Sequence, residues 1–404
     1  MFSPAETEIR KRILLNGKIT FAEFMEVLLY HPQTGYYTSR LDGDHRRDYF
    51  TSPAAHPAFG ALLAVLLSQM WESIGKPDEF HAIEVGSGDG LFARDILRYS
   101  SELSAKFNKA LRYIAIDRSA NRMKSSSGDL SYDKIVSDSI PLTGIIGCVF
   151  SNELIDSFPV RRFEFIDGKI SEIFVTIVDG IVTEHIDVPV YPRIDNSKEI
   201  STLQLKEGSR IEINTGIKPW LTQVGTCLDE GFLLTLDYGY ESKEHQLKTN
   251  NRGTVQTYYN HMQGSSPYDR IGLKDITAHV DFHSIIAEGR PLGIRPVSFI
   301  TQRQFLSSLG IEIWMNRMRT INVGNTVRQA NMMAMRELIN PDGLGGFRVL
   351  VQEKIFRNKS LVSFDSSVLQ TELHQLPIPL MRSEHISLMG GRYPHMTLLG
   401  EELQ

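Results

Sequence analysis

A short glycine-rich stretch is the first feature of the sequence whose residue types and spacing could do chemistry. It reads Glu84-Val85-Gly86-Ser87-Gly88-Asp89-Gly90, an acid followed by three alternate glycines. Glycines lack a Cβ and therefore let the backbone approach a ligand closely. A helix that starts after such a turn also offers unpaired N–H groups to polar ligand atoms. The stretch is a candidate cofactor site, and a purely structural turn is the alternative.

The spacing of the glycines separates two kinds of cofactor. A dinucleotide site has the pattern G-x-G-x-x-G, but Leu91 stands where the third glycine would be. Glu84 also precedes the first glycine, where it could meet the amino group of a cofactor's methionine moiety. Both departures favour S-adenosylmethionine, so an NAD-dependent oxidoreductase is the weaker alternative.

Other polar residues could complete this cofactor site. Asp117 ends an expected strand, where its carboxylate can accept two hydrogen bonds from ribose hydroxyls, although a solvated strand end would look the same. Asp138 and Ser139 precede the next expected strand and are candidates for contact with the adenine amino group. Hydrogen bonds to carboxylates are about twice as strong as neutral ones. Thr51 and Ser52 are expected to close over the cofactor as a lid.

The place to look for the methyl acceptor is the end of the strand expected at 145–150, because ligands bind beside the switch point of such a sheet. That strand is followed by Asn152-Glu153-Leu154-Ile155-Asp156. If the acceptor is an arginine, Glu153 and Asp156 could grip its guanidinium in a fork. The alternative is that both acids only cap the following turn.

Three further residues could assist the acceptor. Methyl transfer from a sulfonium needs alignment, exclusion of water and the management of one proton. Asp281 or Asp237 could support the two acids. His279 is expected in a helix with Asp275, where it could take or relay the proton or be a structural histidine.

The elements that must position these residues alternate between strand and helix. Strands are expected at 80–85, 111–116, 145–150 and 232–236, and helices at 59–71, 91–99 and about 219–229. This alternation predicts an α/β fold with a doubly wound parallel sheet. A strand at 210–214 is expected to resume the pattern, followed by a loop at 240–270, helices at 275–288, 302–309 and 311–340, and a last strand at 347–356.

An antiparallel insertion interrupts the pattern at about 160–190. Its expected strands cover 162–166, 170–178 and 181–186, and Asp167-Gly168 and Asp179-Gly180 separate them. Asp-Gly between such runs is a strong hairpin signal. We therefore divide the chain into an N-terminal helical cap or lid (1–58), a catalytic domain (59–357) and a C-terminal extension (358–404), which is either loosely packed or an oligomer arm. In the cap, two helices are expected within 5–31, and Thr20 is the expected cap of the second.

Composition limits the class of protein. The chain has 404 residues, 41% hydrophobic and 23% charged, which is typical of a globular protein. A net charge of −5 does not indicate the excess of Lys and Arg that binding to a nucleic-acid backbone requires. Cys148 and Cys227 show neither disulfide nor metal-ligand spacing, so we expect no metal and a reducing compartment. No apolar run approaches the roughly 20 residues of a membrane span, and the first residues resemble no targeting peptide, so a cytoplasmic protein is expected.

With these residues in hand, the chain resembles the MidA-like methyltransferases over about residues 8–356. Several motifs in order carry the resemblance: 20–37, Asp48-Tyr49-Phe50-Thr51-Ser52-Pro53, Phe59-Gly60, the glycine turn, 151–160, Leu236-Asp237-Tyr238-Gly239, Gly253-Thr254 with Tyr258 and His261, 275–282, and Gly345-Gly346-Phe347-Arg348-Val349-Leu350. Arg47-Asp48-Tyr49-Phe50 replaces the family's Gly-Asp-Phe, Ser87 replaces proline or alanine, and Asp117 replaces Glu.

The resemblance implies a class I methyltransferase fold that binds S-adenosylmethionine. The family includes a mitochondrial protein arginine methyltransferase that acts in complex I assembly, so a protein arginine acceptor is implied, with a homodimer as a further expectation. Two alternatives stay open. One is an assembly factor that binds the cofactor without transferring methyl groups, and the other is a methyltransferase that acts on a small molecule or lipid.

Overall fold

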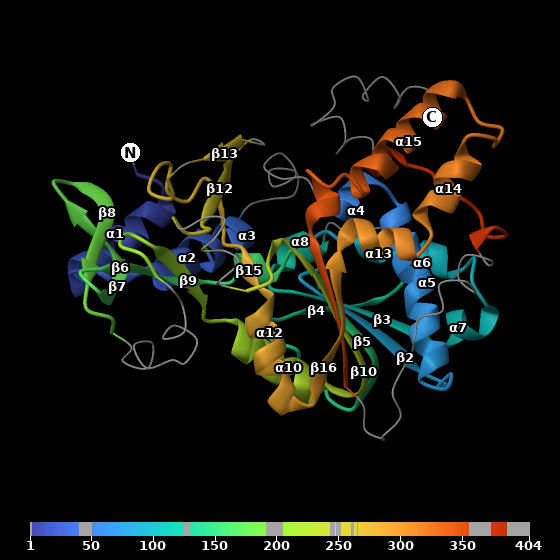
Figure 1. Ribbon diagram of the computed structural model, residues 1–404, viewed down its shortest axis with the longest axis horizontal. Helices are drawn as coiled ribbons and strands as arrows, with labels where there is room; N and C mark the ends of the chain where they lie inside the picture. Colours follow the sequence, from blue (N-terminus) through green and yellow to red (C-terminus); the bar gives the residue numbers. More distant parts are fainter. Residues whose placement is uncertain are drawn as a thin grey trace. The chain divides into compact units, whose positions relative to one another are not determined.

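The computed structural model describes residues 2–39, 51–124, 130–190, 205–242, 247, 252–259, 262–264, 266–354 and 373–385. They fall into two compact units, each made of separate stretches of chain (Figure 1). Unit 1 comprises Met1–Tyr49, Leu154–Leu221 and Tyr238–Glu288, and unit 2 comprises Phe50–Glu153, Thr222–Asp237 and Gly289–Gln404.

Unit 2 contains a seven-stranded sheet in the order β16-β17-β10-β5-β2-β3-β4. Its strands are β2 (Phe80–Val85), β3 (Leu111–Asp117), β4 (Asp133–Val136), β5 (Ile145–Asn152), β10 (Leu228–Asp237), β16 (Ile294–Thr301) and β17 (Arg348–Lys354). Five neighbouring strands, β10 to β4, are parallel, and β17 is antiparallel to both of its neighbours. The chain order reverses at β2, which lies between β3 and β5. Ligands bind at the carboxyl ends of the strands at such a switch point.

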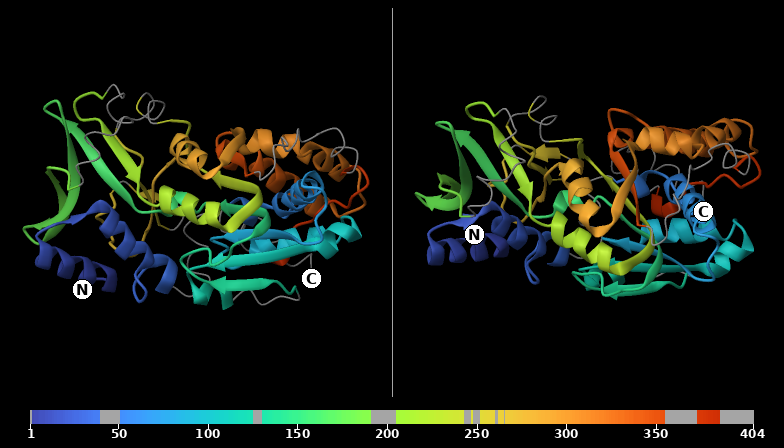
Figure 2. Two further views of the ribbon diagram at one scale, coloured as in Figure 1. Left: turned by 90° about the horizontal axis from the view of Figure 1, so that it is seen from below. Right: turned by 60° about the horizontal axis from the view of Figure 1, so that its bottom comes forward.

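Helices cover this sheet, as the views in Figures 1 and 2 show. They are α4 (Ser52–Ala55), α5 (Ala58–Ser73), α6 (Leu91–Ser100), α7 (Ala105–Ala110), α8 (Ala120–Lys124), the second half of α10 (Ile217–Cys227), α13 (Gln302–Ser308), α14 (Ile311–Met318) and α15 (Asn325–Leu338). One continuous apolar core joins α5, α6 and α13 to α15 to the strands. Phe92 of α6 stacks on Phe59 of α5 at 5.0 Å and meets Phe150 of β5 edge-on at 5.9 Å. These contacts fix the helix that follows the glycine turn.

Unit 1 is built on an antiparallel sheet and the N-terminal helices. The sheet has the order β1-β7-β6-β9, with β8 also paired to β7, and its strands are β1 (Ile19–Thr20), β6 (Val160–Ile166), β7 (Lys169–Val178), β8 (Ile181–Asp187) and β9 (Arg210–Asn214). Its helices are α1 (Pro4–Asn16), α2 (Phe21–Tyr30) and α3 (Tyr36–Ser39). Thr20 caps α2 in a reciprocal capping box with Glu23, as predicted.

Both predicted hairpins of unit 1 are confirmed. Asp167 and Gly168 have φ values of 51° and 73°, and Asp179 and Gly180 have values of 49° and 78°. Two consecutive left-handed residues make the type I′ turn that joins two twisted strands most easily. The turns directly connect β6 to β7 and β7 to β8.

Short elements complete unit 1. They are the turn η2 (Ile155–Ser157), the strands β11 (Gly239–Tyr240), β12 (Gln256–Tyr259), β13 (Met262–Gly264), β14 (Asp275–Thr277) and β15 (Val280–Asp281), and the helix α12 (Phe282–Gly289). In unit 2 the remaining elements are η3 (Arg290–Leu292) and η4 (Leu344–Gly346). Within the described ranges, no helix has both the length and the apolar character that a membrane crossing requires.

Several sequence-based expectations differ from the structure. Residues 210–214 form β9, which pairs with β6 in the antiparallel sheet and does not resume the parallel one, so the insertion is larger than 160–190. The helix expected at 275–288 begins only at Phe282, after β14 and β15. The loop expected at 240–270 contains β12 and β13, and the helix expected at 311–340 is two helices. The expected strand at 347–356 is β17, and residues 355–356 lie outside the described residues.

The two compact units do not follow the domain boundary that the sequence predicts between residues 58 and 59. Helices α1 and α2 bury Ile9, Phe21 and Phe24 in a core shared with Val160 and Val175 of the insertion. They therefore form one unit with the insertion rather than a separate cap. The core arises because β1 extends the same antiparallel sheet by pairing with β7.

Candidate cofactor and acceptor site

The glycine turn joins the end of β2 to the start of α6. Gly86, Gly88 and Gly90 have φ values of 78°, 57° and 73°, the left-handed region that side chains with a Cβ rarely adopt. A Cβ on Gly88 would lie 2.9 Å from Nη2 of Arg122. Gly90 is the residue before α6 and has no side chain to cap it, and Oδ1 of Asp89 accepts a hydrogen bond from the Leu91 N–H at 3.1 Å. The turn thus presents bare backbone in a conformation that disfavours any side chain with a Cβ.

Asp117 ties the end of β3 to this turn. Its Oδ2 accepts a hydrogen bond from the Gly88 N–H at 2.8 Å, and its Oδ1 accepts one from the Ser119 N–H at 2.8 Å. A carboxylate offers about four acceptor positions, so Asp117 keeps capacity for ribose hydroxyls. The residues at this strand end therefore fit the nucleoside of S-adenosylmethionine.

The sequence predicts that Glu84 contacts the cofactor's amino group, and in the structure its carboxyl contacts Tyr113. Its side chain is buried, and its Oε2 accepts a hydrogen bond from Oη of Tyr113 at 2.6 Å. Burial raises the pKa of Glu84 to about 8, although the Tyr113 hydrogen bond lowers it. The carboxyl is consequently mostly protonated at neutral pH. Tyr113 was not singled out in the sequence, because a tyrosine inside an apolar strand gives no signal of its own.

The remaining expected cofactor residues are distributed as follows. Asp138 and Ser139 are exposed and come just after β4, at the carboxyl end of the sheet. Ser87 is buried within the turn, and Thr51 is half-buried before α4. Ser52 differs from the lid expectation, because its side chain is fully buried and its Oγ donates a hydrogen bond to Oε1 of Gln302 at 2.9 Å. A hydroxyl held in this way belongs to the body of unit 2.

Asn152 and Glu153 stand at the end of β5, next to the switch point. Glu153 has a φ of 50°, and its N–H donates a hydrogen bond to the Leu236 carbonyl of β10 at 2.9 Å. Nδ2 of Asn152 donates a hydrogen bond to Oε1 of Glu153 at 3.0 Å. A left-handed backbone costs a non-glycine residue free energy, and such residues cluster at functional sites. The hydrogen bond from Asn152 holds the Glu153 carboxylate at the strand end.

Asp156, His279 and Asp281 belong to unit 1, whereas Asn152, Glu153 and Asp237 belong to unit 2. The buried Asp156 lies in η2, and its carbonyl accepts a hydrogen bond from the Ala278 N–H at 2.9 Å. This bond places η2 beside the loop that carries His279. Asp281 precedes α12 and accepts hydrogen bonds from the Ser284 N–H and Oγ, at 3.4 and 2.7 Å. Asp281 thus acts as a cap of α12.

His279 lies between β14 and β15, and not in a helix with Asp275 as expected. Its Nε2 is 3.2 Å from Nε2 of Gln256, whose Oε1 accepts a hydrogen bond from Oη of Tyr258 at 2.5 Å. An amide nitrogen can only donate, so Nε2 of His279 is the acceptor in this arrangement. Burial lowers the pKa of His279, which keeps the ring neutral. Gln256 was missed in the sequence, although it lies between the motif residues Gly253-Thr254 and Tyr258.

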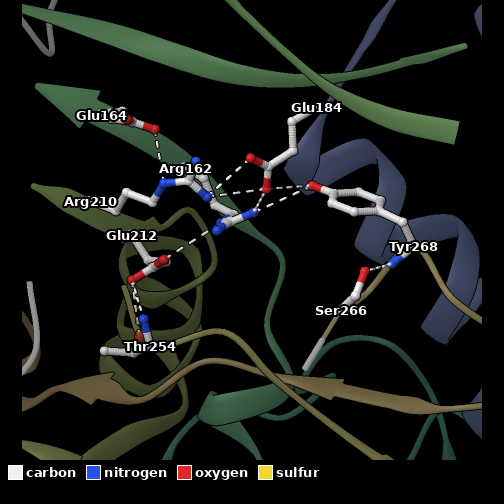
Figure 3. Close-up of polar contacts among 8 residues, drawn as sticks. All are labelled: Arg162, Glu164, Glu184, Arg210, Glu212, Thr254, Ser266 and Tyr268. Carbon is white, nitrogen blue, oxygen red and sulfur yellow. Dashed lines mark hydrogen bonds and ion pairs between the residues drawn. The ribbon is translucent and has the colours of Figure 1, made fainter. Parts of the chain in front are cut away.

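A buried charge network holds the strand that carries Gln256 (Figure 3). Oε2 of Glu212 accepts hydrogen bonds from the N–H and Oγ1 of Thr254, at 2.9 and 3.0 Å, and its Oε1 is 3.6 Å from Nε of Arg162. Nη1 of Arg162 also donates to Oε1 of Glu184 at 2.7 Å. A Cβ on Gly253 would lie 2.4 Å from Glu212 Oε1, which explains why glycine precedes Thr254. The motif residue His261 lies outside the described residues.

Asp237, expected to support the acids, is fully buried at the end of β10. Within the described part of the chain, no three His, Cys, Asp or Glu side chains are grouped as a metal site requires.

Comparisons with known proteins identify the family and the fold of this chain. A crystal structure of a Burkholderia thailandensis protein, described as a "likely methyl transferase" and bound to S-adenosyl-homocysteine, has a TM-score of 0.76 and 25% identity, covering 87% of this chain and 92% of its own. The protein arginine methyltransferase NDUFAF7, mitochondrial, of Homo sapiens is 24% identical over 85% of this chain and 81% of its own length. Its Drosophila melanogaster homolog is 24% identical over 70% of each chain.

A family model described as "Putative S-adenosyl-L-methionine-dependent methyltransferase" matches residues 62–299, more than half of the chain. This range includes the glycine turn, Asp117 and the end of β5. The sheet of unit 2 has the strand order β16-β17-β10-β5-β2-β3-β4, in which β17 is antiparallel to its neighbours. The chain therefore belongs to this family of S-adenosyl-L-methionine-dependent methyltransferases, and its fold is that of a class I methyltransferase.

Proposed function

We propose that this chain transfers the methyl group of S-adenosylmethionine to an arginine side chain of a protein. The relatives named above as protein arginine methyltransferases support the acceptor class. The observation that carries the proposal is the strained Glu153 at the end of β5, followed three residues later by the buried Asp156. Carboxylates bind a guanidinium in a fork geometry, and Glu153 and Asp156 are the two acids that follow the end of β5 in the chain.

The chain's own residues divide the work as follows. Bound S-adenosylmethionine supplies an activated methyl group, so the protein needs no covalent nucleophile. The glycine turn and Asp117 hold the cofactor, and the carboxylates of Glu153 and Asp156 orient the guanidinium. An unbound guanidinium stays protonated in water because its pKa exceeds about 12. Burial lowers the pKa of His279 and so favours its neutral ring. Nε2 of that ring can take up the proton that methylation releases only when it gives up the hydrogen bond from Gln256.

A methylation assay with a matched pair of variants tests this proposal. Purified full-length protein is incubated with cell lysate and S-adenosylmethionine carrying a labelled methyl group, and mass spectrometry identifies the modified residue. Glu153→Gln should bind cofactor with unchanged affinity but lose transfer by about a hundredfold or more, the scale of one well-placed catalytic group. Glu79→Gln is the control, because Glu79 is an exposed acid just before β2, paired with Arg112.

Each outcome has a definite meaning. Label on arginine that depends on Glu153 supports the proposal. Label only on a small molecule or lipid, or tight cofactor binding with no transfer, would replace it with one of the two alternatives. Full activity of Glu153→Gln would remove that residue from the mechanism. The cytoplasmic location and the homodimer stay predictions, which fractionation and sedimentation would test.

A further inference from the structure

The segment of residues 373–385, drawn in red in Figures 1 and 2, lies beyond the residues that the family model matches. We call it the C-terminal strap. The sequence predicts a loosely packed extension or an oligomer arm here, but the described part is packed onto unit 2. Leu373 and His385 are fully buried, and Met381 is 4% exposed.

Polar contacts attach the strap to α14 and α15. Nη1 of Arg317 in α14 donates hydrogen bonds to the carbonyls of Leu373 and Leu376, each at 2.6 Å. Oδ1 of Asn331 in α15 accepts a hydrogen bond from the Met381 N–H at 2.8 Å. These bonds hold the strap at its start and its middle.

The strap also contacts α6 along its length. Oη of Tyr99, near the end of α6, donates a hydrogen bond to the Pro377 carbonyl at 2.8 Å. One turn earlier, Oδ2 of Asp95 is 2.8 Å from Nε2 of His385, and both side chains are at most 1% exposed. Buried ionisable groups of this kind are retained only when they are paired. The strap therefore fixes the helix that follows the glycine turn.

Arg94 connects the strap to the glycine turn itself. Its Nη1 donates a hydrogen bond to the carbonyl of Asp89, inside the turn, at 2.9 Å. Its Nε lies 3.6 Å from Oε1 of Glu384, and only 7% of the Arg94 side chain is exposed. Oε2 of Glu384 is 3.3 Å from Nη1 of Arg98, one turn further along α6. A single guanidinium thus contacts both the turn and the strap.

We propose that the C-terminal strap positions the cofactor turn, with Arg94 and Glu384 as positioning residues that act through the Asp89 carbonyl. The inference rests on the proposed cofactor site at the glycine turn. A loop held in its binding conformation loses less conformational entropy when a ligand binds, so affinity rises. By linkage, the cofactor must then favour the docked strap as strongly as the docked strap favours the cofactor.

Calorimetric titration of the full chain with S-adenosylmethionine tests this coupling. Glu384→Gln should raise the Kd about fivefold, the effect of losing one partly exposed ion pair. Arg94→Gln should raise the Kd at least as much. The Kd of the double variant should exceed that of the unmodified chain by no more than the larger of the two single changes, because both residues act through the same contact with the Asp89 carbonyl. Glu384→Asp should recover part of the affinity. Glu79→Gln is the control and should keep the original Kd.

Hydrogen exchange on the unmodified chain supplies a second readout that needs no variant to fold. Saturating S-adenosylmethionine should slow amide exchange in residues 373–385 as well as in the glycine turn. A strap that only covers apolar surface would give variants with lower stability but an unchanged Kd. If the Kd values of the variants are unchanged, or if the cofactor does not change amide exchange in residues 373–385, this inference is wrong while the cofactor site still stands. Failure of the unmodified chain to bind S-adenosylmethionine overturns the cofactor site as well.

Discussion

Replacing Glu84 with glutamine should change how the stability of the protein depends on pH. Glu84 is 4% exposed at the end of β2, and Tyr113 donates a hydrogen bond to its carboxyl at 2.6 Å. Burial raises the pKa of this carboxyl to about 8. The folded protein therefore keeps the carboxyl protonated at pH 6, and at higher pH it has to bury a charge.

The sign and size of the effect follow from the two pKa values. Because the folded pKa is raised, the stability from this group is fully present below the ordinary value of 4.5 and is lost as pH rises through about 8. Each pKa unit is worth about 1.4 kcal/mol. The linkage relation then gives a loss of roughly 2–3 kcal/mol between pH 6 and pH 9. Glutamine fills the same space and can accept the Tyr113 hydrogen bond, but it does not titrate.

Chemical denaturation at pH 6, 7, 8 and 9 measures this difference. The free energy of unfolding of Glu84→Gln, minus that of the unmodified protein, should increase by roughly 2–3 kcal/mol over this range. Glu79→Gln, an exposed acid one residue before the same strand, should follow the unmodified protein. Parallel pH curves for Glu84→Gln and the unmodified protein would refute the reasoning, because they would mean that Glu84 is ionised throughout.

Three further perturbations test the site. Gly88→Val should abolish S-adenosylmethionine binding in a folded protein, because a β-branched side chain strains the left-handed backbone at φ 57° and enters the space of the cofactor; unchanged calorimetric affinity would place the cofactor elsewhere. Asp281→Ala should lower the free energy of unfolding by about 1 kcal/mol through loss of the α12 cap, whereas Asp281→Asn should keep the cap; if Asp281→Asn also keeps methyl transfer, the charge has no part in the reaction. Burial lowers the pKa of His279, so stability is lost as pH falls below its ordinary value of 6.5. His279→Gln should therefore lose less stability than the unmodified protein between pH 7 and pH 5, and equal losses in denaturation experiments would contradict this assignment.

Elements with strong local signals could be predicted from the sequence. The apolar run of β2 leads directly into three glycines, and the structure places the strand at Phe80–Val85 as expected. Asp-Gly pairs predicted both hairpins of the insertion because Asp-Gly strongly favours the type I′ turn, one of the two turns that join strands through two residues. Thr20 predicted the start of α2, and the structure shows that it acts in a capping box with Glu23, a contact within four residues.

Elements that depend on distant partners could not be predicted in this way. β4 is short, and three of its four residues are exposed, so it lacks the apolar pattern of a strand. The alternating residues of β9 suit a parallel and an antiparallel sheet equally, and its pairing with β6 decides between them. The spacing of 275–288 suits a helix, but the pairing of Asp275 with Tyr258 holds the first residues in β14.

The candidate site was predictable to a similar degree. The glycine turn and Asp117 are adjacent in the structure because β2 and β3 are parallel neighbours, which the alternation of elements implied. The partners Tyr113, Gln256 and Arg94 are brought in by tertiary packing and carry no motif of their own. The buried strap contacts of His385 and Asp95 join residues at opposite ends of the chain, beyond the reach of any local pattern.

The pairing of β1 with β7 has a consequence for folding during synthesis. Ile19 pairs with Val175, so the N-terminal helices cannot complete their sheet until the ribosome has made the insertion. At about 5–20 residues per second, this interval is roughly 10–30 s. During that time the apolar side chains of α2, such as Phe21, Phe24 and Leu28, have no sheet to cover them. The nascent chain therefore passes through a stage in which α2 is prone to aggregation, and a fragment ending before β7 should be insoluble.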